Sequence, residues 1–191
     1  GEPAPKVAPM PEGKPRRYVI IPEDKNRATH PALARNRCIE DMYEPGSTFK
    51  PIVFSAALDA GFTFASLLRD SPMRVEMGPF EEWRPRNADG GFDGPITFWE
   101  AARWSRNLPT LELYRAIGAH ALIRRARALG VATQLDPVES LPLGASCVRP
   151  VDMLTVYASF AVAGQGAVGR VVTRADGEVY VAPPNPWTVH L

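Results

Sequence analysis

Apolar residues recur at three- and four-residue spacing in several stretches of the chain, and this spacing predicts amphipathic helices. The predicted helices cover residues 49–58, 98–104, 109–117, 119–129 and 151–163. Glycine follows three of them, at positions 61, 118 and 130, where helices commonly end. The helix over 151–163 is the most apolar, so we expect it to be a central core helix.

Strand signals are fewer and shorter. Apolar residues at 18–21 predict a strand that Pro22 ends, and a second strand is expected around 73–77. Residues 170–173 and 178–181 flank Asp176-Gly177, the strongest short signal for a β-hairpin. Two proline-rich segments complete the picture: a linker or tail over 1–17 and a C-terminal tail over 182–191.

A long loop or hairpin is expected from Trp83 to Gly91, a stretch rich in proline, glycine and asparagine. Structured loops of this kind often line a functional site. Trp83 offers a flat apolar wall, and we predict that Trp83 and Asn87 bind a substrate. The structural alternative is that Trp83 packs beneath its own loop. Farther along, residues 139–146 predict an extended connector.

A broken helix is the next feature. Thr97 and Glu100 have the spacing of a capping box, which predicts a helix entry at Thr97. Pro109 disfavours helical backbone at residue 108 and suits the first position of a new helix. Ser105 and Asn107 therefore lie on a break between two helices, where polar side chains can face a cleft. The alternative is that both serve only as turn and cap residues.

The most informative stretch surrounds Ser47. Pro45-Gly46 is a turn signal, and Ser47 follows where an N-cap or first-turn residue belongs. Lys50 comes three residues later, so the two side chains share one helical face. A lysine that is partly desolvated near the positive end of a helix dipole can remove the serine proton, and the Ser47 N–H can serve as half of an oxyanion hole. Alternatively, Ser47 only caps the helix and Lys50 is a solvated charge.

Composition narrows the function classes. The 191 residues include 22 basic and 21 acidic side chains, a net charge of +1, which gives no electrostatic case for nucleic acid. No apolar run approaches the roughly 18 residues that a membrane span needs. His30, His120 and His190 lie far apart in the sequence, so we expect no metal site. The sequence has no glycine-rich loop of the kind that binds phosphate, so we expect no cofactor either. Cys38 and Cys147 can form a disulfide or remain as two thiols.

Three segments together resemble the penicillin-binding protein transpeptidases. The nucleophile motif of that family looks like Glu44-Pro45-Gly46-Ser47-Thr48-Phe49-Lys50-Pro51. Its Ser-x-Asn motif resembles Gly94-Pro95-Ile96-Thr97 followed by Ser105-Arg106-Asn107. The segment that follows in the family is similar to Leu143-Gly144-Ala145-Ser146 and the helix with Tyr157-Ala158-Ser159-Phe160-Ala161. The matched stretch covers roughly residues 35–181.

The resemblance implies a peptidoglycan D,D-transpeptidase with a mixed α/β fold of the β-lactamase/transpeptidase type. Ser47 would attack the carbonyl between the two terminal D-alanines of a stem peptide, and β-lactams would acylate the same serine. Lys50 would be the base, assisted by Ser105, while Asn107 would orient the substrate amide and Lys50. The implied partners are stem peptides and other cell-wall synthesis proteins, at the outer face of the cytoplasmic membrane, with an N-terminal membrane anchor in the family.

Two departures from the family pattern lead us to expect a truncated piece. No lysine follows Lys50, so the family's Lys-Thr-Gly strand is absent, and residues 18–21 are the one candidate for the strands before the serine. We expect a partial transpeptidase domain over 18–181, mostly helical with an incomplete antiparallel sheet, and weak or no activity. Two alternatives remain open: a non-catalytic binding or sensing module, and a β-lactamase or carboxypeptidase with a water-activating carboxylate at Glu81, Glu82 or Asp93.

Overall fold

The computed structural model describes residues 37–78, 80–161, 172–175 and 178–181. The chain divides into two units, Gly1–Arg37 and Cys38–Leu191, and nearly all described residues belong to the second. The helices of the described residues are α2 (Arg37–Glu40), η2 (Gly46–Phe49), α3 (Lys50–Asp59), α4 (Phe98–Arg103), α5 (Asn107–Ile117), α6 (Ala119–Ala128), η3 (Leu141–Leu143) and α7 (Pro150–Ala161). Their strands are β1 (Leu67–Asp70), β2 (Val75–Gly78), β3 (Glu81–Trp83), β4 (Gly94–Thr97), β5 (Val172–Ala175) and β6 (Glu178–Val181).

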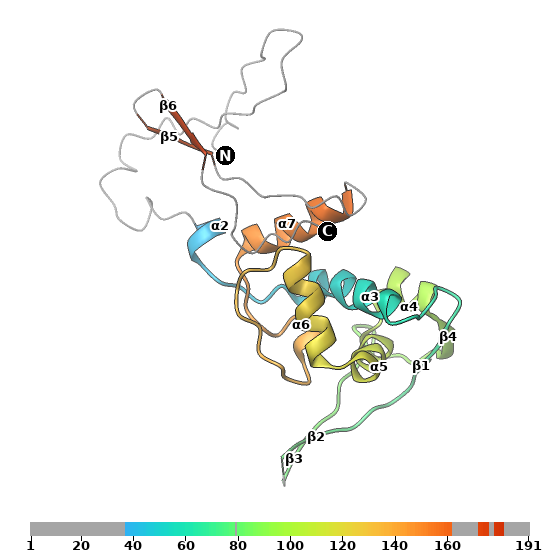
Figure 1. Cartoon of the computed structure of the whole chain (residues 1–191). Coiled ribbons are helices and arrows are strands. Elements are labelled where there is room, and N and C mark those ends of the chain that lie inside the picture. Colours follow the sequence, from blue (N-terminus) through green and yellow to red (C-terminus); the bar gives the residue numbers. More distant parts are fainter. Residues whose placement is uncertain (1–36, 79, 162–171, 176–177, 182–191) are drawn as a thin grey trace, which may run out of the picture. The chain divides into compact units, whose positions relative to one another are not determined.

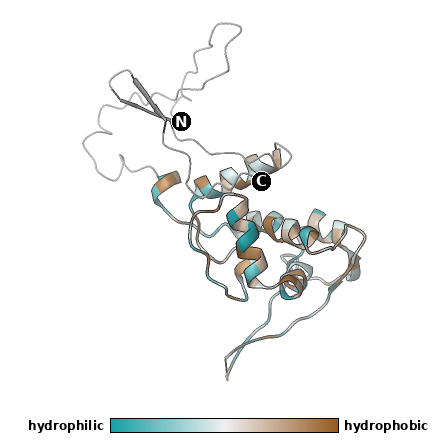
Figure 2. Ribbon diagram, viewed as in Figure 1, coloured by the Kyte–Doolittle hydropathy of each residue, from teal (hydrophilic) through white to brown (hydrophobic). Residues whose placement is uncertain are grey.

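Helix α3 forms the centre of the core, with α5 and α6 packed beside it (Figure 1). The apolar residues that predicted this helix are buried, as expected from their spacing: Phe49, Ile52, Val53, Ala56 and Ala57. Arginine-rich turns give α6 a hydrophilic side next to its buried residues (Figure 2). Helix α3 therefore begins inside the protein, and its first residue, Lys50, is buried with it.

Strands β1 and β4 form an antiparallel pair that supports the helices. Leu68 lies opposite Ile96, and Asp70 lies opposite Gly94. Alternate residues of β1 face inward, so Leu68 and the carboxylate of Asp70 are both buried. The expected strand near 73–77 is confirmed as β2, which pairs with β3. The expected antiparallel pairing of the hairpin is confirmed as β5 and β6, but β5 covers 172–175 where 170–173 was predicted, and the predicted turn at 176–177 lies outside the described residues. The strand predicted at 18–21 and both tails lie outside the described residues.

The helix break is confirmed, with one correction. The Thr97 hydroxyl accepts from the Glu100 N–H at 3.2 Å and the Glu100 carboxylate accepts from the Thr97 N–H at 2.8 Å, which completes the predicted capping box. Helix α5, however, begins at Asn107, so residue 108 is helical and Pro109 is the third helical residue. This position also tolerates proline, because the first N–H groups of a helix have no helical acceptor. The break is therefore shorter than predicted.

The helix predicted over 151–163 is present as α7, but the prediction that it is a central core helix is wrong. Helix α7 buries one side that is largely polar, including Asp152, Thr155 and Ser159. Its large apolar side chains Leu154 and Tyr157 are 64% and 44% exposed. Hydrophobicity along a sequence indicates what a helix can bury but not which face finds a neighbour. Within the described residues, no helix has the length and apolar character required to cross a lipid bilayer.

The connector over 139–146 is also less extended than predicted, because it contains η3 and a left-handed turn at Gly144. Gly144 has φ +78° and its carbonyl accepts from the Gly46 N–H at 3.2 Å. A β-carbon at Gly144 would overlap the backbone of Gly46 and lie 2.7 Å from its Cα. This close approach holds the turn that precedes Ser47 against η3.

We predict that Gly144→Ala lowers the free energy of unfolding more than Gly90→Ala does. Both glycines have similar positive φ values, +78° and +73°, so each variant incurs about 1 kcal/mol of backbone strain. A β-carbon at Gly90 meets no atom within 4 Å, whereas at Gly144 it also clashes, which adds about 1–3 kcal/mol. Urea unfolding of both variants measures the difference, and equal losses would contradict the close contact.

Candidate active site

Ser47 lies on the 3₁₀ turn η2, directly before α3, and its residue is exposed. The Lys50 backbone N–H donates to the Ser47 carbonyl, which closes this turn. In a 3₁₀ helix, side chains three residues apart lie at the same azimuth, so Ser47 and Lys50 share one face. The turn is held from α7 as well, because the Tyr157 hydroxyl donates to the Thr48 carbonyl at 3.1 Å. Ser47 is therefore presented on a braced, accessible turn.

Lys50 is only 1% exposed, and its ammonium faces three oxygen atoms. Its Nζ lies 2.5 Å from the Ser105 carbonyl oxygen, 3.0 Å from Ser105 Oγ and 2.6 Å from Asn107 Oδ1. Burial lowers the pKa of Lys50 from 10.5 to about 8, because desolvation disfavours the charged form. The three acceptors stabilise the ammonium, so the residue stays mostly protonated at neutral pH with about a tenth neutral.

Ser105 is held in a conformation that non-glycine residues seldom adopt. Among the described residues it is the single non-glycine with positive φ, at +52°. Such a left-handed residue costs on the order of 1 kcal/mol and persists where its surroundings hold it. Here the Ser105 N–H donates to the Ala102 carbonyl at 3.3 Å, and the Arg106 N–H donates to the Ala101 carbonyl at 3.0 Å. This backbone turn directs both the carbonyl and the hydroxyl of Ser105 at Lys50.

Asn107 is fixed through its side chain and its backbone. Its Oδ1 accepts from Lys50, and its Nδ2 donates to the Arg86 carbonyl at 2.7 Å. Its backbone N–H donates to Asn87 Oδ1 at 2.8 Å. The structure thus brings three of the four predicted catalytic residues into direct contact, Lys50, Ser105 and Asn107, and places Ser47 one turn away from Lys50.

The two residues predicted to bind substrate occupy different environments. Trp83 is half-buried on β3, where it pairs with Val75 on β2. Asn87 is 5% exposed, and its amide already serves four partners, two as acceptor and two as donor. An asparagine side chain can form four hydrogen bonds, so none of its capacity is left for a substrate. The contacts of Asn87 are therefore those of a buried support beneath Asn107.

Sequence reasoning missed the residues behind the site. In the sequence motif Arg106 is only the spacer between Ser105 and Asn107, yet its side chain is 11% exposed and forms ion pairs with three carboxylates, those of Asp70, Asp89 and Asp93. Asp93, considered above as a water-activating group, is thus occupied by Arg106. The partners lie 13 to 36 residues from Arg106, so no local pattern marks them; a charged residue inside a motif was the one available signal.

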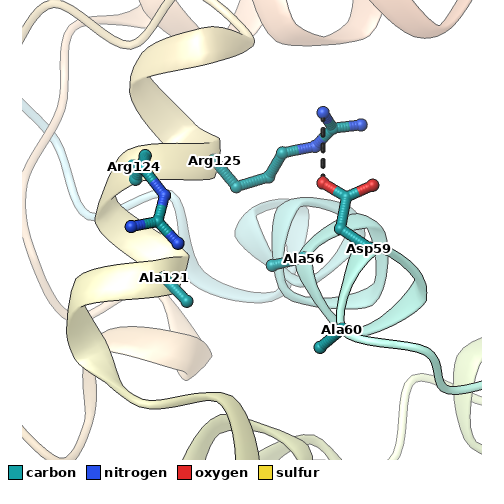
Figure 3. Close-up of a pocket in the computed structure, with 6 residues that line it drawn as sticks. All are labelled: Ala56, Asp59, Ala60, Ala121, Arg124 and Arg125. Carbon is teal, nitrogen blue, oxygen red and sulfur yellow. Dashed lines mark ion pairs between the residues drawn. The ribbon is translucent and has the colours of Figure 1, made fainter.

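A small cavity of about 140 Å³ lies elsewhere, between α3 and α6 (Figure 3). It is lined by Ala56, Asp59, Ala60, Ala121, Arg124 and Arg125. Arg125 donates to Ser55 Oγ at 2.7 Å and pairs with Asp59 at 3.3 Å. The basic side of α6 therefore has a structural role, because Arg125 joins the two helices. The predicted catalytic residues do not line this cavity.

With this geometry established, comparison with known proteins identifies the family. A family model described as "Penicillin binding protein transpeptidase domain" matches residues 14–140. The chain belongs to the penicillin-binding protein transpeptidase family. Penicillin-binding protein 1A of Pseudomonas aeruginosa is 37% identical over 155 residues, which are 78% of this chain and 19% of that protein. Penicillin-binding protein 2D of Bacillus subtilis is 28% identical, over 78% of this chain and 22% of that protein.

Solved structures agree with these relatives. Penicillin-binding protein 1A from Haemophilus influenzae matches with a TM-score of 0.64 and 25% identity, over 79% of this chain and 23% of that one. The imipenem acyl-enzyme complex of penicillin-binding protein A from M. tuberculosis matches with a TM-score of 0.61 and 26% identity, over 76% and 38%. The predicted mixed α/β transpeptidase-type fold is confirmed. The chain spans about a fifth of the length of the curated relatives it matches.

The buried Lys50 predicts that stability rises with pH in the alkaline range. Between pH 8 and 10.5 the unfolded chain binds more protons at this residue than the native chain, so the free energy of unfolding increases with pH. We expect a gain on the order of 1–3 kcal/mol across that window. Urea unfolding of the wild type and of Lys50→Met, measured at each pH, isolates the contribution of this amine. Parallel pH profiles for the two proteins would contradict the lowered pKa.

Proposed function

We propose that this chain carries the acylation centre of a peptidoglycan D,D-transpeptidase, with Ser47 as nucleophile and Lys50 as its base. The observation that carries the proposal is the buried Lys50 amine, which Ser105 and Asn107 hold one helical turn from the exposed Ser47. Membership of the family and the acyl-enzyme complex of a structural neighbour support the same assignment. The enzyme works outside the cytoplasmic membrane on cell-wall peptide, held by a membrane anchor and alongside other cell-wall synthesis proteins.

In the first step, neutral Lys50 takes the proton of Ser47 Oγ as this oxygen attacks the carbonyl carbon between the two terminal D-alanines of a stem peptide. Negative charge develops on the carbonyl oxygen, and the Ser47 N–H is available to it because amides in the first turn of a helix have no helical acceptor. The C–N bond then breaks. D-Alanine leaves with a proton that passes from Lys50, directly or through the Ser105 hydroxyl, and an acyl-serine ester remains.

In the second step, an amine of a neighbouring stem peptide attacks the ester. Lys50 accepts the amine proton and returns a proton to Ser47 Oγ, so the serine is regenerated and a new amide bond forms. Asn107 supports both steps, because its amide contacts the Lys50 ammonium at 2.6 Å and lies on the first turn of α5. A β-lactam would be opened by the first step and remain on Ser47.

We predict that a fluorescent penicillin forms a covalent adduct on Ser47. Ser47→Ala abolishes labelling because the attacking oxygen is gone, whereas Ser140→Ala, a change at the serine before η3, leaves it intact. Labelling is read from a denaturing gel over hours, since we expect slow acylation. Trypsin cuts after Arg37 and Arg69 but not before Pro51, so mass spectrometry should place the adduct on peptide 38–69.

Labelling of Ser47→Ala at the wild-type level would overturn the assignment, and so would an adduct that mass spectrometry places outside peptide 38–69. The same assay separates the related chemistries. A stable adduct is the outcome for a transpeptidase, whereas steady release of opened β-lactam indicates a hydrolase that activates water.

The acylation rate should rise with pH as Lys50 loses its proton. Below the Lys50 pKa of about 8, only the neutral fraction can act as base, so we expect a roughly tenfold rise per pH unit that levels off near pH 8. Lys50→Arg keeps the charge but cannot act as a base. The acylation rate therefore falls by about a hundredfold or more and no longer rises with pH. A Lys50→Arg protein whose acylation rate still rises with pH as in the wild type would contradict the role of Lys50.

A further inference from the structure

We propose that Asp70, Asn87 and Arg106 form a buried positioning unit that holds the Ser105–Asn107 segment against Lys50. The inference rests on the proposed function for its catalytic consequence, and on the contacts of these three residues for its geometry. None of the three is a catalytic residue, because each acts through the residues that contact Lys50.

Asp70 anchors the unit from strand β1. It ends β1, its side chain faces the core beside Leu68, and it is 0% exposed. Its Oδ1 accepts from Asn87 Nδ2 at 2.7 Å, while Oδ2 accepts from the Asp93 N–H at 3.2 Å and lies 3.3 Å from Arg106 Nε. An ionised carboxylate is stable in the interior only when such partners replace water. Asp70 therefore fixes the loop residue Asn87 by a hydrogen bond and attracts the motif residue Arg106 by charge, because Arg106 Nε lies within ion-pair distance without forming a hydrogen bond.

Asn87 transmits this position to the start of α5. Its Oδ1 accepts from the backbone N–H groups of Asn107 and Leu108, at 2.8 and 3.4 Å. Its Nδ2 donates to Asp70 and, at 2.9 Å, to the Gly91 carbonyl. The N-cap residue of α5, Arg106, makes no side-chain cap bond, so Asn87 acts as the cap from a distant loop. The first turn of the helix that carries Asn107 is thus oriented by a residue twenty positions earlier.

Arg106 is the third member of the unit and directly precedes Asn107 in the sequence. Its guanidinium reaches Asp70, lies 2.6 Å from Asp89 Oδ2 and pairs with Asp93. A planar guanidinium can serve several carboxylates in one fixed orientation, which a lysine cannot do. Because Ser105 and Asn107 flank Arg106 in the sequence, anchoring this one side chain limits the movement of both neighbours.

The unit has a chemical consequence because Lys50 depends on the segment it holds. All three oxygens that face the Lys50 ammonium come from Ser105 and Asn107. If that segment relaxes, water reaches the amine, its neutral fraction at pH 7 falls, and the proton acceptor for Ser47 is lost. A displacement of about 1 Å at a catalytic group can cost on the order of a hundredfold in rate.

The test uses two variants and a matched control. Asn87→Ala removes the acceptor for the first turn of α5, and Asp70→Asn removes the charge that holds Arg106. Asp152→Asn is the control, because Asp152 is a buried carboxylate of similar kind, 2% exposed and bonded to the Thr133 N–H at 3.0 Å, on α7. It reports the effect of losing a buried carboxylate without touching the Ser105–Asn107 segment.

The first readout is independent of acylation. The chain has four lysines, so ¹³C-lysine NMR gives four side-chain signals, and Lys50→Met identifies the one from Lys50. We expect the Lys50 pKa to rise toward its ordinary value in Asn87→Ala and Asp70→Asn and to stay unchanged in Asp152→Asn. The second readout is the second-order rate of acylation by fluorescent penicillin, which we expect to fall about 10- to 100-fold in the first two variants only.

A reciprocal exchange tests whether hydrogen bonding, and not mere stability, is responsible. In the double variant Asp70→Asn with Asn87→Asp, donor and acceptor trade places between residues 70 and 87, and residue 87 still accepts from Asn107, but the donor to the Gly91 carbonyl is lost. We therefore expect it to recover only part of the lost rate relative to Asp70→Asn. If Asn87→Ala fails to fold, Asn87→Ser, which keeps a smaller acceptor, is measured in its place.

A folded Asn87 variant with a wild-type Lys50 pKa and an acylation rate within about twofold of wild type would overturn the positioning role, as would equal effects from Asp152→Asn. Failure of the proposed function looks different. In that case the wild-type protein forms no adduct on Ser47, while the Lys50 signal still shows whether Asp70 and Asn87 control the amine.

Discussion

The site depends on the enclosure of one ammonium group. Burying Lys50 at the start of α3 removes its charge from water, and this is favourable only if oxygen atoms replace the lost hydration. Its three acceptors come from a segment 55 to 57 residues away, so the helix that carries Lys50 and the break that carries Ser105 and Asn107 must be placed together. Much of the surrounding structure can be understood as meeting this requirement.

The break itself is the strained part of the arrangement. A continuous helix from α4 into α5 would direct the residue-105 carbonyl along the helix axis and occupy it with a hydrogen bond inside the helix. The left-handed backbone of Ser105 turns this carbonyl toward the amine, at a cost that its neighbours offset. Ala101 and Ala102 accept backbone hydrogen bonds on one side, and the buried amide of Asn87 accepts from Asn107 on the other. Strain is thus confined to one residue whose two functional oxygens both face Lys50.

Local features were predictable from the sequence because local physics produces them. The spacing of Phe49, Ile52 and Val53 predicted α3, and Thr97 with Glu100 predicted the start of α4. The four proposed catalytic residues were assigned differently, through the resemblance of their motifs to the transpeptidase family, because their spacing alone fits turn and cap residues as well. Asn87 shows the limit of the method. An asparagine in a loop suits substrate binding and buried support equally, and only its four contacts distinguish the two.

The missed features are those that depend on distant partners. Leu154 and Tyr157 make α7 look like a core helix, yet exposure is decided by which neighbour covers them. Arg106 and Asp70 are ordinary charged residues until β1 places the carboxylate beneath the helix break.

Ser47 and Lys50 differ in their exposure to solvent, and this difference decides which of the two a substrate can reach. The hydroxyl is on an exposed 3₁₀ turn where a peptide can approach, whereas the amine behind it is closed to solvent. An amine open to water would keep a high pKa, whereas enclosure lowers the pKa of Lys50 to about 8. In the proposed mechanism this leaves Ser47 as the accessible proton donor. Deeper burial without acceptors would keep the amine neutral and unable to hold the proton it receives. The three oxygens set the balance between these limits, which makes the placement of Ser105 and Asn107 as important as the presence of Lys50.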